Sequence, residues 1–331
     1  MKWRLVFLFA LVVGLARPYV LAQNGDYFDF VISETYLNQL AREGILPAVA
    51  VHMDARTKKV HTLAADCEIH MATTPADQLG DPPSIVVEPP NVCKFPPPNS
   101  PKTTETNLRN VIWPKLFDKW VMGKDCEVTG FPRIFTEHAQ GAADPANPNH
   151  VLEIHPAMAI RCGSYQLDFT SFLTALPGMR AVKPDTAVSC ISQRKLEVRY
   201  ADEQYQFREE GGQCGNFAIV EVSNLNPKWV HAVKGGHSAI ARVSADGKSL
   251  TTLKIYTLTG TKADGWLGSY KKGGNARLFL HGMFTFDYFA ILRTVRTPDG
   301  QWTHPSDWQV VKFPLAFVVF GEAETAPWEE P

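Results

Sequence analysis

The chain has 331 residues, of which 45% are hydrophobic and 20% are charged. This composition is typical of a folded protein and excludes a wholly disordered chain. The formal net charge is -1, so the chain as a whole does not attract nucleic acid or anionic lipid, and we do not expect nucleic acid as a partner.

Residues 1–22 have the features of a secretory signal peptide. Lys2 and Arg4 precede an apolar run from Leu5 to Leu15, and Val20-Leu21-Ala22 supplies small residues for cleavage. The apolar run is short for a membrane span, and no later stretch has 18 uninterrupted apolar residues. We therefore expect a secreted or periplasmic protein with no membrane span after cleavage. An uncleaved N-terminal anchor is the alternative.

Residues 23–44 are expected to form an N-terminal helical strap, because Ser33 is a favourable helix N-cap and Gly44 a favourable helix end. Residues 45–162 follow as a first domain. Its apolar patterns predict strands at 48–53, 60–71 and 84–88, a helix over 105–122, and strands at 126–135 and 150–160.

This order of three strands, a helix and two strands is that of the OB-fold, a five-stranded, partly closed barrel with a helix between its third and fourth strands. Gly130, inside the fourth strand, is suited to the bulge or bend that such barrels need. We therefore predict a mainly β protein that begins with an OB-fold-like barrel.

Residues 163–325 read as a second β-rich domain, a β-sandwich or barrel. Strand patterns occur at 196–200, 217–222, 239–243, 250–258, 276–280, 285–295 and 308–320. Residues 326–331 are expected to be a disordered tail.

The six cysteines are even in number, and none forms a C-x-x-C pair. In an exported chain this pattern favours disulfide bonds over a zinc knuckle or a thiol nucleophile. Cys190 and Cys214 are expected to pair with each other. The other four leave three connectivities open: Cys67, Cys93, Cys126 and Cys162.

A repeated tripeptide is the main functional clue, Glu68-Ile69-His70 and Glu153-Ile154-His155. Side chains alternate along a strand, so Asp66, Glu68 and His70 would share one face. Glu153 and His155 would likewise share a face. If the two strands are neighbours, these five side chains converge on one patch that suits zinc, or calcium through its oxygen-rich members.

The loop after the fourth strand carries Glu137 and His138, the candidates for general acid/base chemistry. Arg133, near the end of that strand, is placed to clamp a phosphate or carboxylate, or else to pair with Glu127. Each Glu-x-His pair has a structural alternative, in which it hydrogen-bonds across strands and binds nothing.

The first domain resembles a loose group of uncharacterised exported bacterial proteins through Asp66 to His70, Glu88 to Cys93, Gly130, Glu137-His138 and Glu153 to Pro156. That resemblance spans roughly residues 48–162 and implies no function. By architecture alone the domain is also similar to thermonuclease-type OB-folds, which bind calcium and cleave phosphodiesters. The chain departs from those enzymes in lacking basic character and paired arginines.

Two functional hypotheses follow. In the first, Asp66, Glu68, His70, Glu153 and His155 supply the ligands of zinc or calcium, and the protein hydrolyses an ester or phosphodiester with Glu137 or His138 as acid/base. In the second, the protein is a non-enzymatic cell-envelope module that binds glycan or protein.

Overall fold

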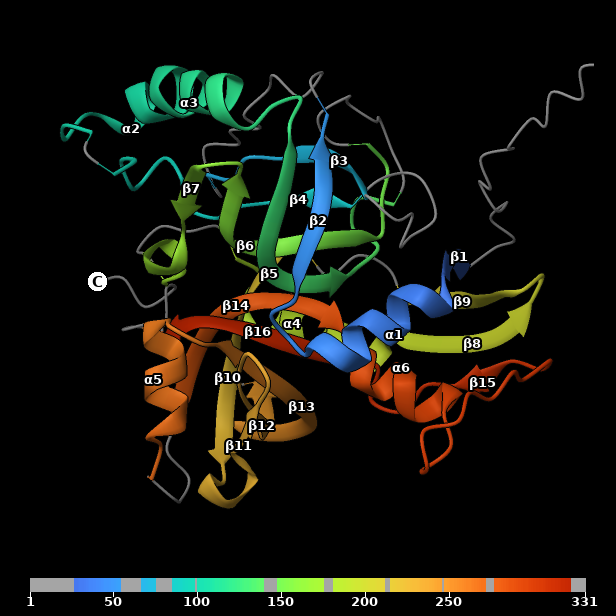
Figure 1. Ribbon diagram of the computed structural model, residues 1–331. Coiled ribbons are helices and arrows are strands. Elements are labelled where there is room, and N and C mark those ends of the chain that lie inside the picture. The colour runs from blue at the N-terminus through green and yellow to red at the C-terminus, as the bar shows by residue number, and fades with distance from the viewer. Residues whose placement is uncertain are drawn as a thin grey trace, which may run out of the picture.

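The computed structural model describes residues 27–54, 67–75, 85–98, 100–139, 148–175, 181–211, 215–245, 247–271 and 277–322. The predicted signal peptide, Asp66, Cys214 and the predicted C-terminal tail lie outside the described residues. The described chain forms two closed five-stranded barrels and a separate four-stranded sheet (Figure 1). No helix in these ranges is long and apolar enough to cross a membrane.

The first barrel has the strand connectivity expected of an OB-fold. Its strands run in the order β4-β3-β2-β5-β6, and a parallel pairing of β4 with β6 closes it. A helical segment lies between its third and fourth strands, and β7 extends the sheet beside β6. The elements are β2 (Ala48–Met53), β3 (Met71–Pro75), β4 (Val86–Val87), α2 (Glu105–Asn107), a π-helical turn (Leu108–Ile112), α3 (Trp113–Trp120), β5 (Asp125–Ile134), β6 (Leu152–Cys162) and β7 (Tyr165–Asp168).

The second barrel repeats that connectivity. Of the two architectures predicted for the second β-rich domain, a sandwich or a barrel, the structure shows the barrel. Its order is β10-β14-β16-β13-β12, closed by β10 with β12, and its parallel pair is again formed by the third and fifth strands. The elements are β10 (Phe217–Leu225), β11 (His231–Val233), β12 (Gly236–Ala245), β13 (Lys248–Leu258), α5 (Lys262–Gly268), β14 (Leu278–Phe286) and β16 (Leu315–Glu322).

The remaining strands form an antiparallel sheet in the order β1-β9-β8-β15. Helix α1 begins after Ser33, whose side chain accepts a hydrogen bond from the Tyr36 N–H, and ends at Gly44, as the sequence predicts. The strand that precedes this helix was not foreseen. The elements are β1 (Tyr27–Ile32), α1 (Glu34–Glu43), α4 (Pro184–Gln193), β8 (Lys195–Ala201), β9 (Gln204–Glu210), α6 (Tyr288–Val295) and β15 (Gln309–Val310), with 3-10 turns at Thr170–Phe172 and Pro227–Trp229.

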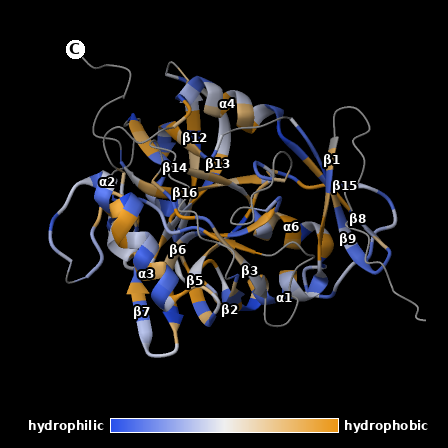
Figure 2. Cartoon of the chain, turned by 90° about the horizontal axis from the view of Figure 1, so that it is seen from above, coloured by the Kyte–Doolittle hydropathy of each residue, from blue (hydrophilic) through white to orange (hydrophobic). Residues whose placement is uncertain are grey.

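Apolar residues gather on the strands of the two barrels, as Figure 2 shows. Strand β14 of the second barrel passes beside β5 of the first: the backbone N–H of Ile134 donates to the hydroxyl of Thr285 at 3.2 Å. The two barrels therefore meet along these strands.

Three predicted strands differ from the structure. The predicted strand over 308–320 is two strands of different sheets, β15 and β16. Residues 67–70 belong to no strand, since β3 begins at Met71 and Cys67 has a positive φ of 56°, which breaks an extended chain. The predicted strand over 285–295 is instead the end of β14 followed by α6. Asp287 caps that helix, because its carboxylate accepts from the Phe289 N–H.

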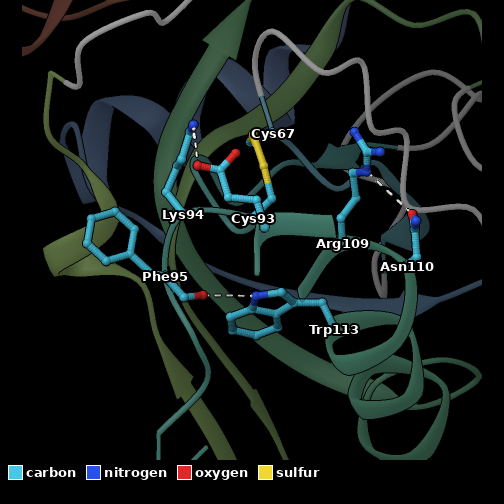
Figure 3. Close-up of a disulfide and its surroundings, with 8 residues drawn as sticks. Cys67, Cys93, Lys94, Phe95, Arg109, Asn110 and Trp113 are labelled. Carbon is cyan, nitrogen blue, oxygen red and sulfur yellow. Dashed lines mark hydrogen bonds and ion pairs between the residues drawn. A yellow bond between two sulfur atoms is a disulfide. The ribbon is translucent and has the colours of Figure 1, made fainter. Parts of the chain in front are cut away.

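Disulfide bonds join Cys67 to Cys93 and Cys126 to Cys162, which selects one of the three connectivities that the sequence left open. Cys190 is also disulfide-bonded, but its predicted partner is not among the described residues. Figure 3 shows the Cys67–Cys93 bond beside Trp113, whose indole N–H donates to the Phe95 carbonyl at 3.1 Å. Such bonds fit a chain that folds in an oxidising compartment.

Gly130 lies at the predicted bulge, where the register of β5 against β6 shifts on both sides of it. A Cβ at this position would lie 2.4 Å from Ile154 Cγ2 and 2.6 Å from the Pro156 carbonyl oxygen. Only glycine allows β5 to approach the middle of β6 this closely.

We expect Gly130→Ala to lower the free energy of unfolding by about 2 kcal/mol, because the added methyl group overpacks the contact between β5 and β6. Urea denaturation measures the change. Gly265→Ala is the control: it lies in α5 with nothing within 4 Å of the added Cβ, so it should leave stability unchanged or raise it. A Gly130→Ala protein as stable as the wild type contradicts the prediction.

Candidate functional site

The register of the first barrel brings a group of acidic and basic side chains together. Val86 and Val87 of β4 pair with Glu153 and Ile154 of β6, so Glu88, one residue further, lies next to His155. Glu68 precedes β3, and the bond between its neighbour Cys67 and Cys93 holds it close to Glu88 and His155. Glu68, Glu88, Glu153 and His155 are all completely buried, at 0% exposure.

His155 is the hub of this group. Its Nε2 lies 2.6 Å from Glu68 Oε1, and its Nδ1 lies 2.8 Å from Glu88 Oε2 and 3.3 Å from Glu153 Oε2. Burial acts to lower the pKa of His155, but the charges of Glu68 and Glu88 outweigh burial and raise it well above its usual value. Both ring nitrogens therefore act as donors to carboxylates.

Arg133 on β5 supplies a second buried positive charge. It faces Glu153 in the register, its Nη1 donates to Glu153 Oε2 at 2.7 Å, and its Nε donates to the Phe284 carbonyl of β14 at 2.7 Å. The alternative pairing with Glu127 does not occur, because Glu127 pairs with Arg161 at 2.7 Å. Arg133 thus joins the group to the second barrel.

Three further histidines border the group. His150 Nδ1 lies 2.5 Å from the Pro148 carbonyl oxygen, and its Nε2 lies 3.2 Å from Glu153 Oε1 and 4.0 Å from Glu88 Oε1. His70 Nε2 lies 3.7 Å from Glu88 Oε1. The ring of His138 packs against both, with centroid distances of 5.4 Å to His150 and 5.9 Å to His70.

The carboxylates differ in their electrostatic state. Burial alone would raise the pKa of Glu88, but the charges of His70 and His155 lower it to about 2. Within the described part of the chain, neither oxygen of Glu88 accepts a hydrogen bond of good geometry. Burial raises the pKa of Glu137 to about 7, against the opposing charge of Arg133. Glu88 is therefore charged at neutral pH, while Glu137 is poised to exchange a proton there.

The structure brings together Glu68, His70, Glu153 and His155 of the predicted ligands, while Asp66 lies outside the described residues. The predicted acid/base residues Glu137 and His138 lie on the adjoining loop. The predicted ligand set did not include Glu88 or His150, although each stands at an end of a predicted strand. Arg133 was expected to clamp a phosphate or carboxylate, and in the structure the carboxylate that it holds is Glu153. Sequence reasoning missed Asn216, whose side-chain amide donates to Glu68 Oε2 at 3.2 Å.

Among the residues that the structure describes, two sets of three ligand atoms lie close enough to hold one ion, and both include Glu88: Glu68, Glu88 and His155, and Glu88, His150 and Glu153. Zinc bonds of about 2.0–2.1 Å place tetrahedral ligand atoms about 3.3 Å apart. The contacts of His155 at 2.6 Å to Glu68 and 2.8 Å to Glu88 are both shorter than this; the first is a hydrogen bond and the second an ion pair. The separations of 3.2 and 4.0 Å around His150 bracket the zinc value, so the second set is the better candidate.

A scan of protein-family models matches none of this chain, and a search of curated proteins returns no match. The resemblance to uncharacterised exported proteins stays a prediction.

We expect Arg133→Met to lower the free energy of unfolding by about 3 kcal/mol or more, because it leaves Glu153 buried without its hydrogen-bonded cation. The matched control is Arg161→Met, on the same two strands. That arginine pairs with Glu127 at the surface, and its loss should cost about 1 kcal/mol or less. Urea denaturation of both variants tests this, and equal losses would contradict it.

His281 on β14 lies behind the group. It is 3% exposed, and neither of its ring nitrogens has a hydrogen-bond partner among the residues that the structure describes. The ring of Phe217 packs against both histidines, with centroid distances of 5.9 Å to His281 and 5.9 Å to His155. Burial lowers the pKa of His281 to about 4.

This pKa predicts an acid-sensitive contribution to stability. The unfolded chain, with an ordinary histidine pKa near 6.5, binds the proton first as the pH falls. Stability is therefore present above about pH 6.5 and is lost progressively toward pH 4, by on the order of 3 kcal/mol. In His281→Phe the loss should be smaller by that amount. The test is to measure the free energy of unfolding of the wild type and of His281→Phe from pH 7 to pH 4. Parallel curves of unfolding free energy against pH for the two proteins would refute the prediction.

Proposed function

We propose that the protein is an exported metal-dependent hydrolase that holds one divalent ion on Glu88, Glu153 and His150. The observation that carries the proposal is the orientation of His150. The Pro148 carbonyl can only accept, so Nδ1 carries the proton, and in the neutral imidazole Nε2 then presents its lone pair toward Glu153 Oε1 and Glu88 Oε1. Nε2 of this neutral form and the two carboxylate oxygens are three ligand atoms that one metal ion could bridge.

The chemistry of this set favours zinc over calcium. Calcium takes oxygen ligands, whereas zinc accepts imidazole nitrogen together with carboxylate oxygen. A histidine that binds zinc commonly donates its other ring N–H to a carbonyl, as His150 does to Pro148. Three protein ligands with a fourth position left for water is the pattern of catalytic zinc sites.

His155 and Glu68 take a supporting part in this proposal, in place of the ligand role that the tripeptides suggested. His155 Nδ1 lies within 3.3 Å of both ligand glutamates, and Glu68 holds its other nitrogen at 2.6 Å. Such outer partners fix the orientation of metal ligands.

Glu137 and His138 are the proposed acid/base residues. Zinc lowers the pKa of bound water to about 7, and the pKa of Glu137 of about 7 suits it to take up and return a proton at neutral pH. Burial lowers the pKa of His138, so its imidazole is neutral and able to accept a proton. The proposed reaction is hydrolysis of an ester or phosphodiester.

Metal uptake tests the proposal. The mature chain, purified without chelator and dialysed against zinc, should carry one zinc per chain by mass spectrometry. We expect Glu88→Gln to weaken zinc binding at least 100-fold in a competition titration with a chromophoric chelator, because it removes a charged ligand.

Glu221→Gln is the matched control. Glu221 is a buried glutamate of β10 that accepts from Ser244 at 2.9 Å and pairs with Arg277 at 2.9 Å, so its substitution should leave zinc binding unchanged. Absence of zinc uptake by the wild type, or equal uptake by Glu88→Gln, would show that the group is a purely structural network.

A further inference from the structure

One nitrogen of the Arg133 guanidinium, Nη2, donates no hydrogen bond to the described residues. The other two, Nε and Nη1, donate to Phe284 and Glu153, but the buried Nη2 has no hydrogen-bond partner in the described ranges. Buried donors are nearly always satisfied in native proteins, and an unsatisfied one costs about 1–3 kcal/mol. The planar fork of arginine is suited to phosphate and carboxylate oxygens.

Glu137 borders the same position. Its Oε2 lies 3.8 Å from Arg133 Nη2, too far for a hydrogen bond, and this buried oxygen also has no partner within the described residues. An oxygen atom placed about 2.8 Å from each would bond to both. Because burial raises the pKa of Glu137 to about 7, its carboxyl group can hold a proton and donate to an anion instead of repelling it. With an anion bound in this way, His138 is the acid/base residue of the proposed reaction.

The place of this pair in the fold suits a ligand site. Glu137 follows β5, on the loop between the fourth and fifth barrel strands, which is one of the loops that flank the ligand face of an OB-fold. Its side chain is 20% exposed, whereas Glu88 and Glu153 are fully buried. Of these acidic residues, Glu137 therefore lies nearest to solvent.

We propose that Arg133 Nη2 and Glu137 Oε2 bind one oxygen of an oxyanion, so that the substrate of the proposed hydrolase carries a phosphate or carboxylate group at this point. The inference rests on the proposed function and adds the substrate class. The partner of Arg133 in this subsite is an exchangeable ligand, whereas Glu153 is its permanent partner.

Isothermal titration of the zinc-loaded mature chain with inorganic phosphate, and separately with acetate, tests the subsite. We expect phosphate or acetate to bind, and Glu137→Ala to weaken that binding about tenfold while zinc content stays the same. The tighter of the two ligands identifies the class of anion. Thermal unfolding in the absence of ligand confirms that the variant is folded.

Glu127→Ala is the matched control, since Glu127 lies on the same strand and pairs with Arg161 at the surface; its anion binding should equal that of the wild type. A zinc-loaded protein that binds neither anion, or that binds equally well as Glu137→Ala, overturns the subsite and leaves the zinc proposal standing. If the chain takes up no zinc, the proposed function fails by itself. Titration of that metal-free protein then upholds the subsite through a Glu137-dependent anion affinity, or overturns it through the lack of one.

Discussion

The central constraint on this structure is the burial of three carboxylates, Glu68, Glu88 and Glu153, around one imidazole. Removing a charge from water costs several kcal/mol unless an opposite charge and hydrogen bonds replace the solvent. His155 and Arg133 supply two positive charges, at 2.6–3.3 Å and 2.7 Å from the carboxylates. Glu88 is the carboxylate whose oxygens accept no well-formed hydrogen bond from the described residues. His70 supplies a third positive charge: burial acts to lower its pKa, but Glu88 and Glu68 raise it to about 9, and its Nε2 lies 3.7 Å from Glu88 Oε1. The unsatisfied oxygens of Glu88, and not an excess of negative charge, are therefore the feature that leaves a place for a further ligand.

The two barrels share a connectivity but differ at the matching position. In the first barrel, Glu88 lies one residue past the β4 segment that pairs with β6. In the second, Thr257 lies one residue past the matching segment of β13 and pairs with His237. A single carboxylate, Asp264, bonds to both of these residues at 2.8 Å. At this position the second barrel thus holds one acid, whereas the first barrel holds several. The second barrel also contributes two groups to the site in the first barrel: the Phe284 carbonyl, which accepts from Arg133, and the Asn216 amide, which donates to Glu68.

The sequence predicted the OB-fold-like barrel because its strand order, its intervening helix and Gly130 are all local features. It also predicted that Glu153 and His155 lie together, since both follow the alternation of β6. The convergence of Glu68 was foreseen for the wrong reason: a loop held by the Cys67–Cys93 bond, and not a strand, brings it into place. The part of Asn216 had no local signature, because it depends on how a distant barrel packs. Helix α6 was mistaken for a strand because its apolar residues are continuous, and only the Asp287 cap distinguishes it.

Anomalous diffraction at the zinc edge, from crystals of the chain purified without chelator, would show directly whether a metal ion lies among these side chains and which of them bind it. We expect one peak at bonding distance, about 2.0–2.2 Å, from carboxylate oxygens of Glu88 and Glu153 and from Nε2 of His150, with His155 still hydrogen-bonded to Glu68. A fully ordered site with no anomalous peak, in crystals grown with zinc, would contradict it, as would a peak whose imidazole ligand is His155.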